Sequence, residues 1–106
     1  MTFIGSPNSS AIGVDDTSYA EFQKELLRQP DKGEVMQHAG GLRKVRMRLP
    51  GRGKSGGARV IYLYLERHDA IVFFYIYTKA KSENLTGEQL KRLRNAVATI
   101  KQEYQP

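Results

Sequence analysis

The sequence contains no cysteine, so the chain can form neither a disulfide bond nor a thiolate metal site. It also lacks a long hydrophobic run, because the longest one, Ala70 to Tyr77, is far too short to cross a bilayer. The N-terminal residues MTFIGSPNSS have neither a charged leader nor an apolar core, and we expect no signal peptide. We therefore expect a cytoplasmic protein that does not contact a membrane.

Acidic residues are almost missing from the middle of the chain. The net charge is +6 over the whole sequence, but residues 43–67 alone carry +7, from eight cations and one acid, Glu66. Residues 1–42 carry −3, from three cations and six acids, and residues 68–106 carry +2, from six cations and four acids. A basic balance favours polyanionic partners. Because the excess is concentrated in one segment, it favours a nucleic-acid or phosphate site over a surface that is only solubilising.

The length of 106 residues suits one small domain and is too short for two. A hydrophobic fraction of 40% is enough to fill one modest core. We therefore predict a single domain over residues 1–106. Thr2 to Ile4 could form a short strand. The first part as a whole, residues 1–16, is expected to be loop-like or partly disordered, because Gly5 to Asp16 is rich in Ser, Gly, Pro, Asn and Asp.

Two capping boxes predict helices near the two ends of the chain. Ser18 and Glu21 have capping-box spacing, so a helix should begin at Tyr19, and Pro30 should end it. The second box, Thr86–Gln89, should open a final helix with one apolar face. That face is predicted to consist of Leu90, Leu93, Val97, Ile100 and Tyr104.

The residues between the helices have the period of two that is typical of strands. In LRKVRMRL, residues 42–49, the apolar residues point one way and the cations Lys44, Arg46 and Arg48 the other. Ala58 to Leu65 and Ala70 to Tyr77 have few polar residues and should be buried on both faces. We predict an α+β fold: an antiparallel sheet of about four strands with N-terminal and C-terminal helices packed on it.

The segment PGRGKSGG, residues 50–57, resembles the end of a nucleotide-binding phosphate loop. Such a loop needs G-x-x-x-x-G-K-[ST] between a strand and a helix. Arg48 stands where the first glycine should be, and a strand rather than a helix is predicted to follow, so no helix N-terminus is available to hold a phosphate. The loop is predicted to join two adjacent strands, with glycines that let the backbone turn sharply. An ordinary hairpin with solubilising charge remains the alternative.

Four pieces of sequence follow one another in a distinctive order. They are GGLRK at 40–44, GRGKSGG at 51–57, RVIY at 59–62 and YTK at 77–79, ahead of the final helix. Together they resemble the RelE/HigB superfamily of bacterial type II toxins, and most of all its HigB-type branch. The match runs from about Phe22 to Leu93. Many RelE-type members have an arginine after the last strand and a tyrosine near the final helix, where this chain has Lys79-Ala80-Lys81 and Leu85-Thr86.

The resemblance implies a compact antiparallel sheet with terminal helices, related to the microbial RNases. It implies an mRNA interferase, an endoribonuclease that inhibits translation by cutting mRNA in the ribosomal A site. The implied partners are mRNA on the ribosome, ribosomal RNA, and a cognate antitoxin, which is often a helix-turn-helix DNA-binding protein.

RNA cleavage without a metal uses the 2′-hydroxyl as nucleophile. It needs a proton acceptor, a proton donor for the leaving oxygen, and fixed positive charge at the phosphate. His38 and His68 lie in predicted connectors, and His68 is expected at the far end of its hairpin, so we favour neither as a proton carrier. A lysine can replace histidine where neighbouring cations disfavour its protonated form. We expect no metal and no cofactor.

Guided by the resemblance, we assign four candidate catalytic residues. Lys54 is the candidate general base. Arg59 would hold the scissile phosphate, because a guanidinium stays charged and matches a phosphate with two donors. Arg52 would bind substrate and assist proton transfer, and Lys79 would add charge or a late proton.

Further residues are candidates for RNA binding. Lys44, Arg46, Arg48 and Lys81 would contact the RNA backbone, which gives salt-dependent affinity without sequence choice. Tyr77 could stack on a base. Plain solubility is the alternative for the cations and core packing for Tyr77, while for the neighbouring Tyr75 packing is the favoured interpretation.

Three functions remain open at this point. The first is an RNA-cleaving toxin that acts on ribosome-bound message. The second is a non-catalytic RNA- or ribosome-binding module, and the third is an antitoxin-binding domain with reduced activity. The grouping of Lys54 and Arg59 with the loop favours the first.

Overall fold

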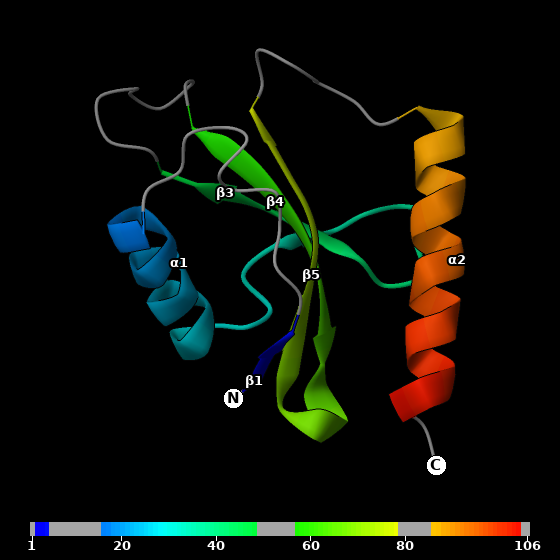
Figure 1. Cartoon of the computed structure of the whole chain (residues 1–106), viewed down its shortest axis with the longest axis horizontal. Helices are drawn as coiled ribbons and strands as arrows, with labels where there is room; N and C mark the ends of the chain where they lie inside the picture. Colours follow the sequence, from blue (N-terminus) through cyan, green and yellow to red (C-terminus); the bar gives the residue numbers. More distant parts are fainter. Residues whose placement is uncertain (1, 5–15, 49–56, 79–85, 105–106) are drawn as a thin grey trace.

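The computed structural model describes residues 2–4, 16–48, 57–78 and 86–104. These residues form a five-stranded sheet with one helix on each side of it (Figure 1). Helix α1 (Asp16–Arg28) covers one face, and helix α2 (Gly87–Tyr104) stands against the other. The predicted α+β class, with helices packed on a sheet, is confirmed.

The strands follow the order β1-β5-β4-β3-β2 across the sheet. They are β1 (Thr2–Ile4), β2 (Glu34–Val35), β3 (Arg43–Met47), β4 (Ala58–Leu65) and β5 (Ala70–Thr78). The pairs β2–β3, β3–β4 and β4–β5 are antiparallel, whereas β1 is parallel to β5. The sheet therefore has one strand more than expected and one parallel edge. The extra strand, β2, is too short to leave a period in the sequence.

Helix α1 begins at Asp16, earlier than the predicted start at Tyr19, so Ser18 lies in its first turn instead of preceding the helix. Within the segment predicted to be loop-like, residues 2–4 form strand β1, and residues 5–15 lie outside the described residues. Phe22 and Leu26 are the buried residues of α1, and they join the apolar side chains of β3, β4 and β5 that face this helix. The helix ends at Arg28, shortly before Pro30, as predicted.

Tyr62, at the middle of β4, connects the end of α1 to the sheet. Its fully buried hydroxyl donates to the carbonyl of Pro30 at 2.7 Å and accepts from the amide of Gly33 at 2.9 Å. A Cβ atom at Gly33 would lie 2.9 Å from the Tyr62 ring, so only glycine fits there. Burial raises the pKa of Tyr62, while the Gly33 hydrogen bond and then the charge of Arg43 act in the opposite direction.

Helix α2 opens with the predicted capping box. The Gln89 amide donates to the Thr86 hydroxyl at 3.1 Å, and the Thr86 amide donates to the Gln89 side-chain oxygen at 2.9 Å. The predicted apolar face of α2 packs on the sheet, but only Val97 on it is buried, with 2% of its surface exposed. No helix within the described ranges is long and apolar enough to cross a membrane.

The turn before β3 supports α2 from the side. Gly40 and Gly41 both have positive φ, at 69° and 103°, which brings the turn backbone close to the helix. A Cβ atom at Gly40 would lie 3.1 Å from Val97, and the Gly40 carbonyl accepts a hydrogen bond from Lys101 at 2.8 Å. Gly40 and Gly41 therefore allow this turn to pack closely against α2.

A bulge interrupts the pairing of β4 with β5. Ile61 is opposite Tyr75, but the next residue, Tyr62, is opposite Phe73, so Phe74 is an extra residue on β5. Phe73 consequently joins the core on the α1 side, while Phe74 and Tyr75 both pack on the α2 side. Two consecutive aromatic residues thus lie on the same side of the sheet.

Candidate nucleic-acid interface

Two of the candidate arginines lie in one row across the sheet. Arg46 on β3 is the register partner of Arg59 on β4, and Arg59 is the partner of Tyr77 on β5. Residues directly opposite each other on antiparallel strands have Cβ atoms about 4.5–5.5 Å apart. We call Arg46, Arg59 and Tyr77 the cationic row.

The cationic row lies next to one end of the sheet. The following row is Met47, Ala58 and Thr78, where β3 ends, β4 begins and β5 ends. The glycine loop connects the first two of these residues, and the segment that begins at residue 79 continues from the third. Arg52, Lys54, Lys79 and Lys81 belong to these two segments and lie outside the described residues, so their roles stay predictions.

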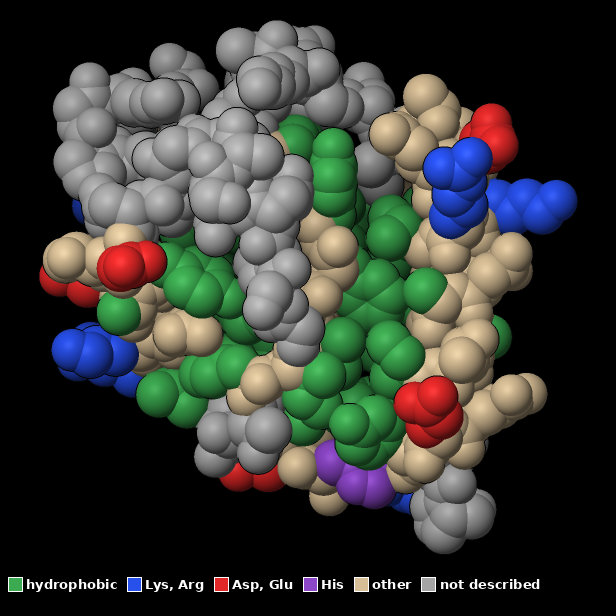
Figure 2. Space-filling model, in the orientation of Figure 1, with side chains coloured by type: hydrophobic (Ala, Val, Ile, Leu, Met, Phe, Trp, Pro, Cys, Tyr) green, Lys and Arg blue, Asp and Glu red, His purple; other side chains and the backbone are tan. Residues whose placement is uncertain are grey.

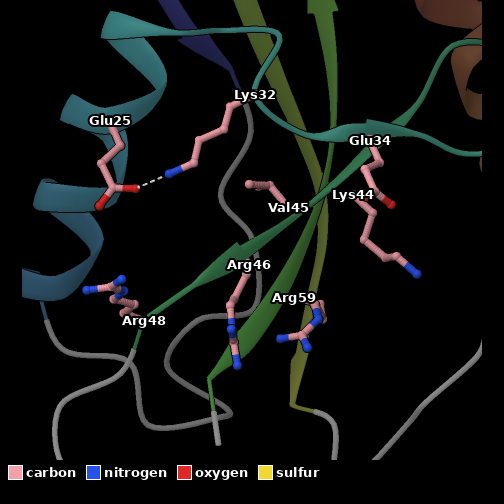
Figure 3. Close-up of a pocket in the computed structure, with 8 residues that line it drawn as sticks. All are labelled: Glu25, Lys32, Glu34, Lys44, Val45, Arg46, Arg48 and Arg59. Atoms are coloured by element: carbon pink, nitrogen blue, oxygen red, sulfur yellow. Dashed lines mark hydrogen bonds and ion pairs between the residues drawn. The ribbon is translucent and has the colours of Figure 1, made fainter. Parts of the chain in front are cut away.

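Figure 3 shows Arg46 and Arg59 extending side by side from neighbouring strands, with Arg48 just past the end of β3. Arg46 and Arg48 are exposed, and Arg59 is half-buried. Within the described part of the chain, none of the three forms a salt bridge with an acidic side chain. Like charges directly opposite each other destabilise a sheet. A pair of opposed arginines with no carboxylate partner among the described residues is therefore suited to hold an anion.

A cavity of about 400 Å³ opens beside these arginines, along the outer edge of β3 (Figure 3). It forms because the pairing with β2 stops at Lys44, which leaves the edge of β3 beyond it without a neighbouring strand among the described residues. Its lining consists of Glu25, Lys32, Glu34, Lys44, Val45, Arg46, Arg48 and Arg59.

The charges in this cavity are not equivalent. Lys32 is neutralised by Glu25 at 2.8 Å, and Lys44 is the register partner of Glu34. The arginines Arg46, Arg48 and Arg59 are left as the excess positive charge. Arg43, on the same strand as Lys44, has a structural role instead, since it donates to the carbonyls of Asp31 and Gly33 at 3.1 and 2.7 Å.

Tyr77, the third member of the cationic row, is almost completely covered, with 4% of its surface exposed. Burial raises its pKa, and the charge of Arg59 acts in the opposite direction. Its ring stacks on Tyr75, with centroids 5.7 Å apart and planes 26° apart. Tyr75 is only half-buried, so it offers more ring surface to a ligand than Tyr77 does. The sequence favoured packing for Tyr75 and base stacking for Tyr77, because alternation alone does not tell which of two stacked rings is covered.

The two histidines lie away from the cationic row. His38 is an exposed residue with φ of 57° in the turn between β2 and β3. His68 lies in η2 (Glu66–His68), which joins β4 to β5 at the opposite end of both strands. Its ring makes an edge contact with Tyr104 of α2, at 5.4 Å between centroids. Neither is placed to exchange a proton with a phosphate held by Arg59.

The chain matches a protein-family model and is similar to solved structures. A family model described as the RelE toxin of the RelE/RelB toxin–antitoxin system matches residues 22–105. Among solved structures, the chain is similar to a doubly substituted mutant of the Escherichia coli toxin RelE in the free state. The TM-score is 0.54 at 18% sequence identity, and the alignment covers 87% of this chain and 94% of that one. That likeness shows the fold, while the family model spans most of the sequence. The chain therefore belongs to the RelE toxin family of toxin–antitoxin systems.

Proposed function

We propose that this chain is an endoribonuclease that cleaves mRNA in the A site of the ribosome, without a metal, and so inhibits translation. Membership of the RelE toxin family supports a toxin that acts in a toxin–antitoxin system. The observation that carries the proposal is the opposition of Arg46 and Arg59 next to the end of the sheet where the glycine loop begins and ends. Such a pair can hold a phosphate from two sides.

In the proposed reaction the 2′-oxygen of one nucleotide forms a bond to the adjacent phosphorus. The bond from phosphorus to the 5′-oxygen of the next nucleotide breaks. Lys54 takes the proton of the 2′-hydroxyl, and Lys79 gives a proton to the leaving oxygen. Arg59 binds the phosphoryl oxygens with its two-pronged guanidinium and stabilises the charge that develops there. Arg52 binds the substrate beside them and assists the proton transfer.

The remaining cations would bind the RNA backbone. Arg46 and Arg48 are exposed and lack a described carboxylate partner, which supports a contact with phosphates of the message or of ribosomal RNA. Lys44 is opposed by Glu34, so its contribution should be smaller. Lys81 is proposed for the same task from its sequence position alone.

The family pairs each toxin with an antitoxin, so this toxin has an antitoxin partner. We propose that this partner is a helix-turn-helix DNA-binding protein, of the kind that the HigB-type branch uses. A reading frame for such a protein next to this one, whose product relieves the toxic effect on co-expression, is the expected finding. An antitoxin of another fold would contradict this part of the proposal.

Induced expression in bacteria tests the proposed activity. The wild-type chain should arrest growth, and Arg59→Ala or Lys54→Ala should relieve the arrest, because one lost transition-state contact costs about 10²–10³-fold in rate. Arg67→Ala is the matched control, since Arg67 is an exposed arginine at the opposite end of the sheet. Equal arrest by wild type and Arg59→Ala would refute the catalytic assignment. Unaltered growth with the wild type would favour a non-catalytic RNA- or ribosome-binding module.

A further inference from the structure

We propose that the groove between β5 and α2 is a nucleobase pocket, which binds a base of the nucleotide adjoining the phosphate at Arg46 and Arg59. This inference rests on the proposed function and makes it more specific. The cations bind any RNA backbone, whereas a base pocket makes the rate depend on the message itself.

The groove is a second cavity of the molecule, with a volume of about 350 Å³. This is near the lower end of the range of small-molecule pockets, about 300–1,000 Å³. In Figure 2, hydrophobic side chains gather between β5 and α2 on the face that is viewed. The groove is lined by Phe74, Tyr75, Gln89, Arg92, Leu93 and Ala96.

The β-bulge gives the groove its aromatic wall. Regular alternation would turn Phe74 and Tyr75 to opposite faces of the sheet. The extra residue lets both pack on the α2 side, and both remain only half-buried. Bulges are frequent next to functional sites, where they re-aim a side chain. Half-exposed aromatic rings in a groove are the surface on which unpaired bases stack.

Tyr75 connects the groove to the cationic row. Tyr75 stacks on Tyr77, which is the register partner of Arg59. Tyr75 is thus the diagonal neighbour of Arg59 across the two strands, and such neighbours lie about 7–8 Å apart. One nucleotide can bridge that distance from its phosphate to its base. A phosphate between the two arginines would therefore leave the attached base within reach of Tyr75.

Two polar side chains at the helix wall can complete the recognition. The capping bond engages the side-chain oxygen of Gln89, so its amide NH₂ group is the part left to donate to a ligand, and it has no acceptor among the described residues. The exposed Arg92 pairs with Glu88 at 3.0 Å and can stack its guanidinium on a base or bind a phosphate. An apolar groove with a few such groups is the usual build of a pocket for a small planar ligand.

Ribosomes that carry a defined message test this pocket. The substrates are the intact message and three messages with an abasic nucleotide at each A-site position in turn, and the measured quantity is the single-turnover cleavage rate. We expect one abasic position to slow the wild type by about 5- to 150-fold, the equivalent of one lost base stack. Ala96→Phe should fill the groove and lower the rate on the intact message to the abasic rate, with no further loss on the abasic message.

Ala98→Phe is the matched control, because Ala98 carries the same side chain on the exposed side of α2 and lines neither cavity. It should behave like the wild type on every message. Equal wild-type rates on intact and abasic messages would overturn the pocket while leaving the proposed function in place. No cleavage of any message by the wild type would instead contradict the proposed function. An Ala96→Phe variant that cuts normally but escapes neutralisation by the antitoxin would reassign the groove to a protein partner and refute the pocket.

Discussion

The opposed pair Arg46 and Arg59 should cost the folded protein stability when no anion is bound. Like charges directly opposite on a sheet destabilise it by roughly 0.2–1 kcal/mol. Coulomb's law gives about 0.7 kcal/mol for two unit charges about 6 Å apart in water, and the exposure of Arg46 justifies the water value. We therefore expect an unfavourable coupling of about 0.5 kcal/mol between the two side chains.

A double-mutant cycle measures this coupling without the intrinsic preference of each residue for a strand. Arg46→Thr, Arg59→Thr and the double mutant would be unfolded in urea at low salt. Each single substitution should raise the free energy of unfolding by more than it does when the other arginine is already replaced. In 1 M salt the Debye length is about 3 Å, so the coupling should disappear. Pairing Arg46 with Arg67, which is remote from it, should give no coupling.

Addition of RNA should make the wild type more stable than either single mutant. A ligand that binds only the folded state stabilises it more the more tightly it binds, so the wild type should gain more than either single mutant. A coupling of zero or of favourable sign between Arg46 and Arg59 at low salt would refute the claim that their repulsion prepares the row to bind an anion. Equal stabilisation of wild type and mutants by RNA would do the same.

Other consequences of the structure can be tested on the purified protein. Tyr62→Phe leaves the Pro30 carbonyl and the Gly33 amide without their buried partner, and urea unfolding should show a loss of about 1–3 kcal/mol. Burial raises the pKa of Tyr62 above its ordinary value of 10.0, so the stability that its neutral hydroxyl contributes is fully present below pH 10 and is lost as the pH rises through the folded pKa. The free energy of unfolding should therefore fall at alkaline pH, and it should fall less steeply in Tyr62→Phe than in the wild type. An identical pH dependence in the two proteins would contradict this. Arg48→Ala should reduce the salt slope of binding to single-stranded RNA by about 0.7, with an unaltered slope arguing against a phosphate contact.

Elements with a strong local pattern were predictable from the sequence. Strand β4 has the predicted bounds and β5 extends one residue beyond them, because runs of β-branched and aromatic residues end at polar turns. The second capping box and the apolar face of α2 were also predicted, because both depend on residues that are close together in the sequence. The family itself was identified from the order of short motifs, and the family model confirms it.

Features that depend on distant residues were not predictable. Strand β2 consists of two residues and exists because the turn after it places β3 alongside. The parallel pairing of β1 with β5 joins residues at two distant places in the chain, and no local pattern encodes it. Helix α1 begins at Asp16, three residues before the start that the Ser18 capping box predicted.

The candidate site was predictable in composition and only partly in geometry. Alternation along β3 and the residue after it correctly separated the exposed Arg46 and Arg48 from the buried Val45 and Met47. That Arg46 faces Arg59 is a property of strand register, which the sequence of either strand leaves open. The groove depends on the bulge at Phe74. The position of a bulge cannot be predicted in a strand whose residues are all hydrophobic, because the sequence does not alternate between polar and apolar residues there.

The central claim is that the chain breaks RNA by attack of a 2′-hydroxyl at the cationic row. The most direct measurement uses purified ribosomes, a message with a mapped cleavage site, and the same message with one 2′-deoxynucleotide on the 5′ side of that site. The wild type should leave 2′,3′-cyclic phosphate ends on the unmodified message, and the deoxy substitution should abolish cleavage at that linkage. Arg59→Ala should cut the unmodified message about 10²–10³-fold more slowly than the wild type. Cleavage of the deoxy message at the normal rate, or products that end in a 3′-hydroxyl, would contradict the account.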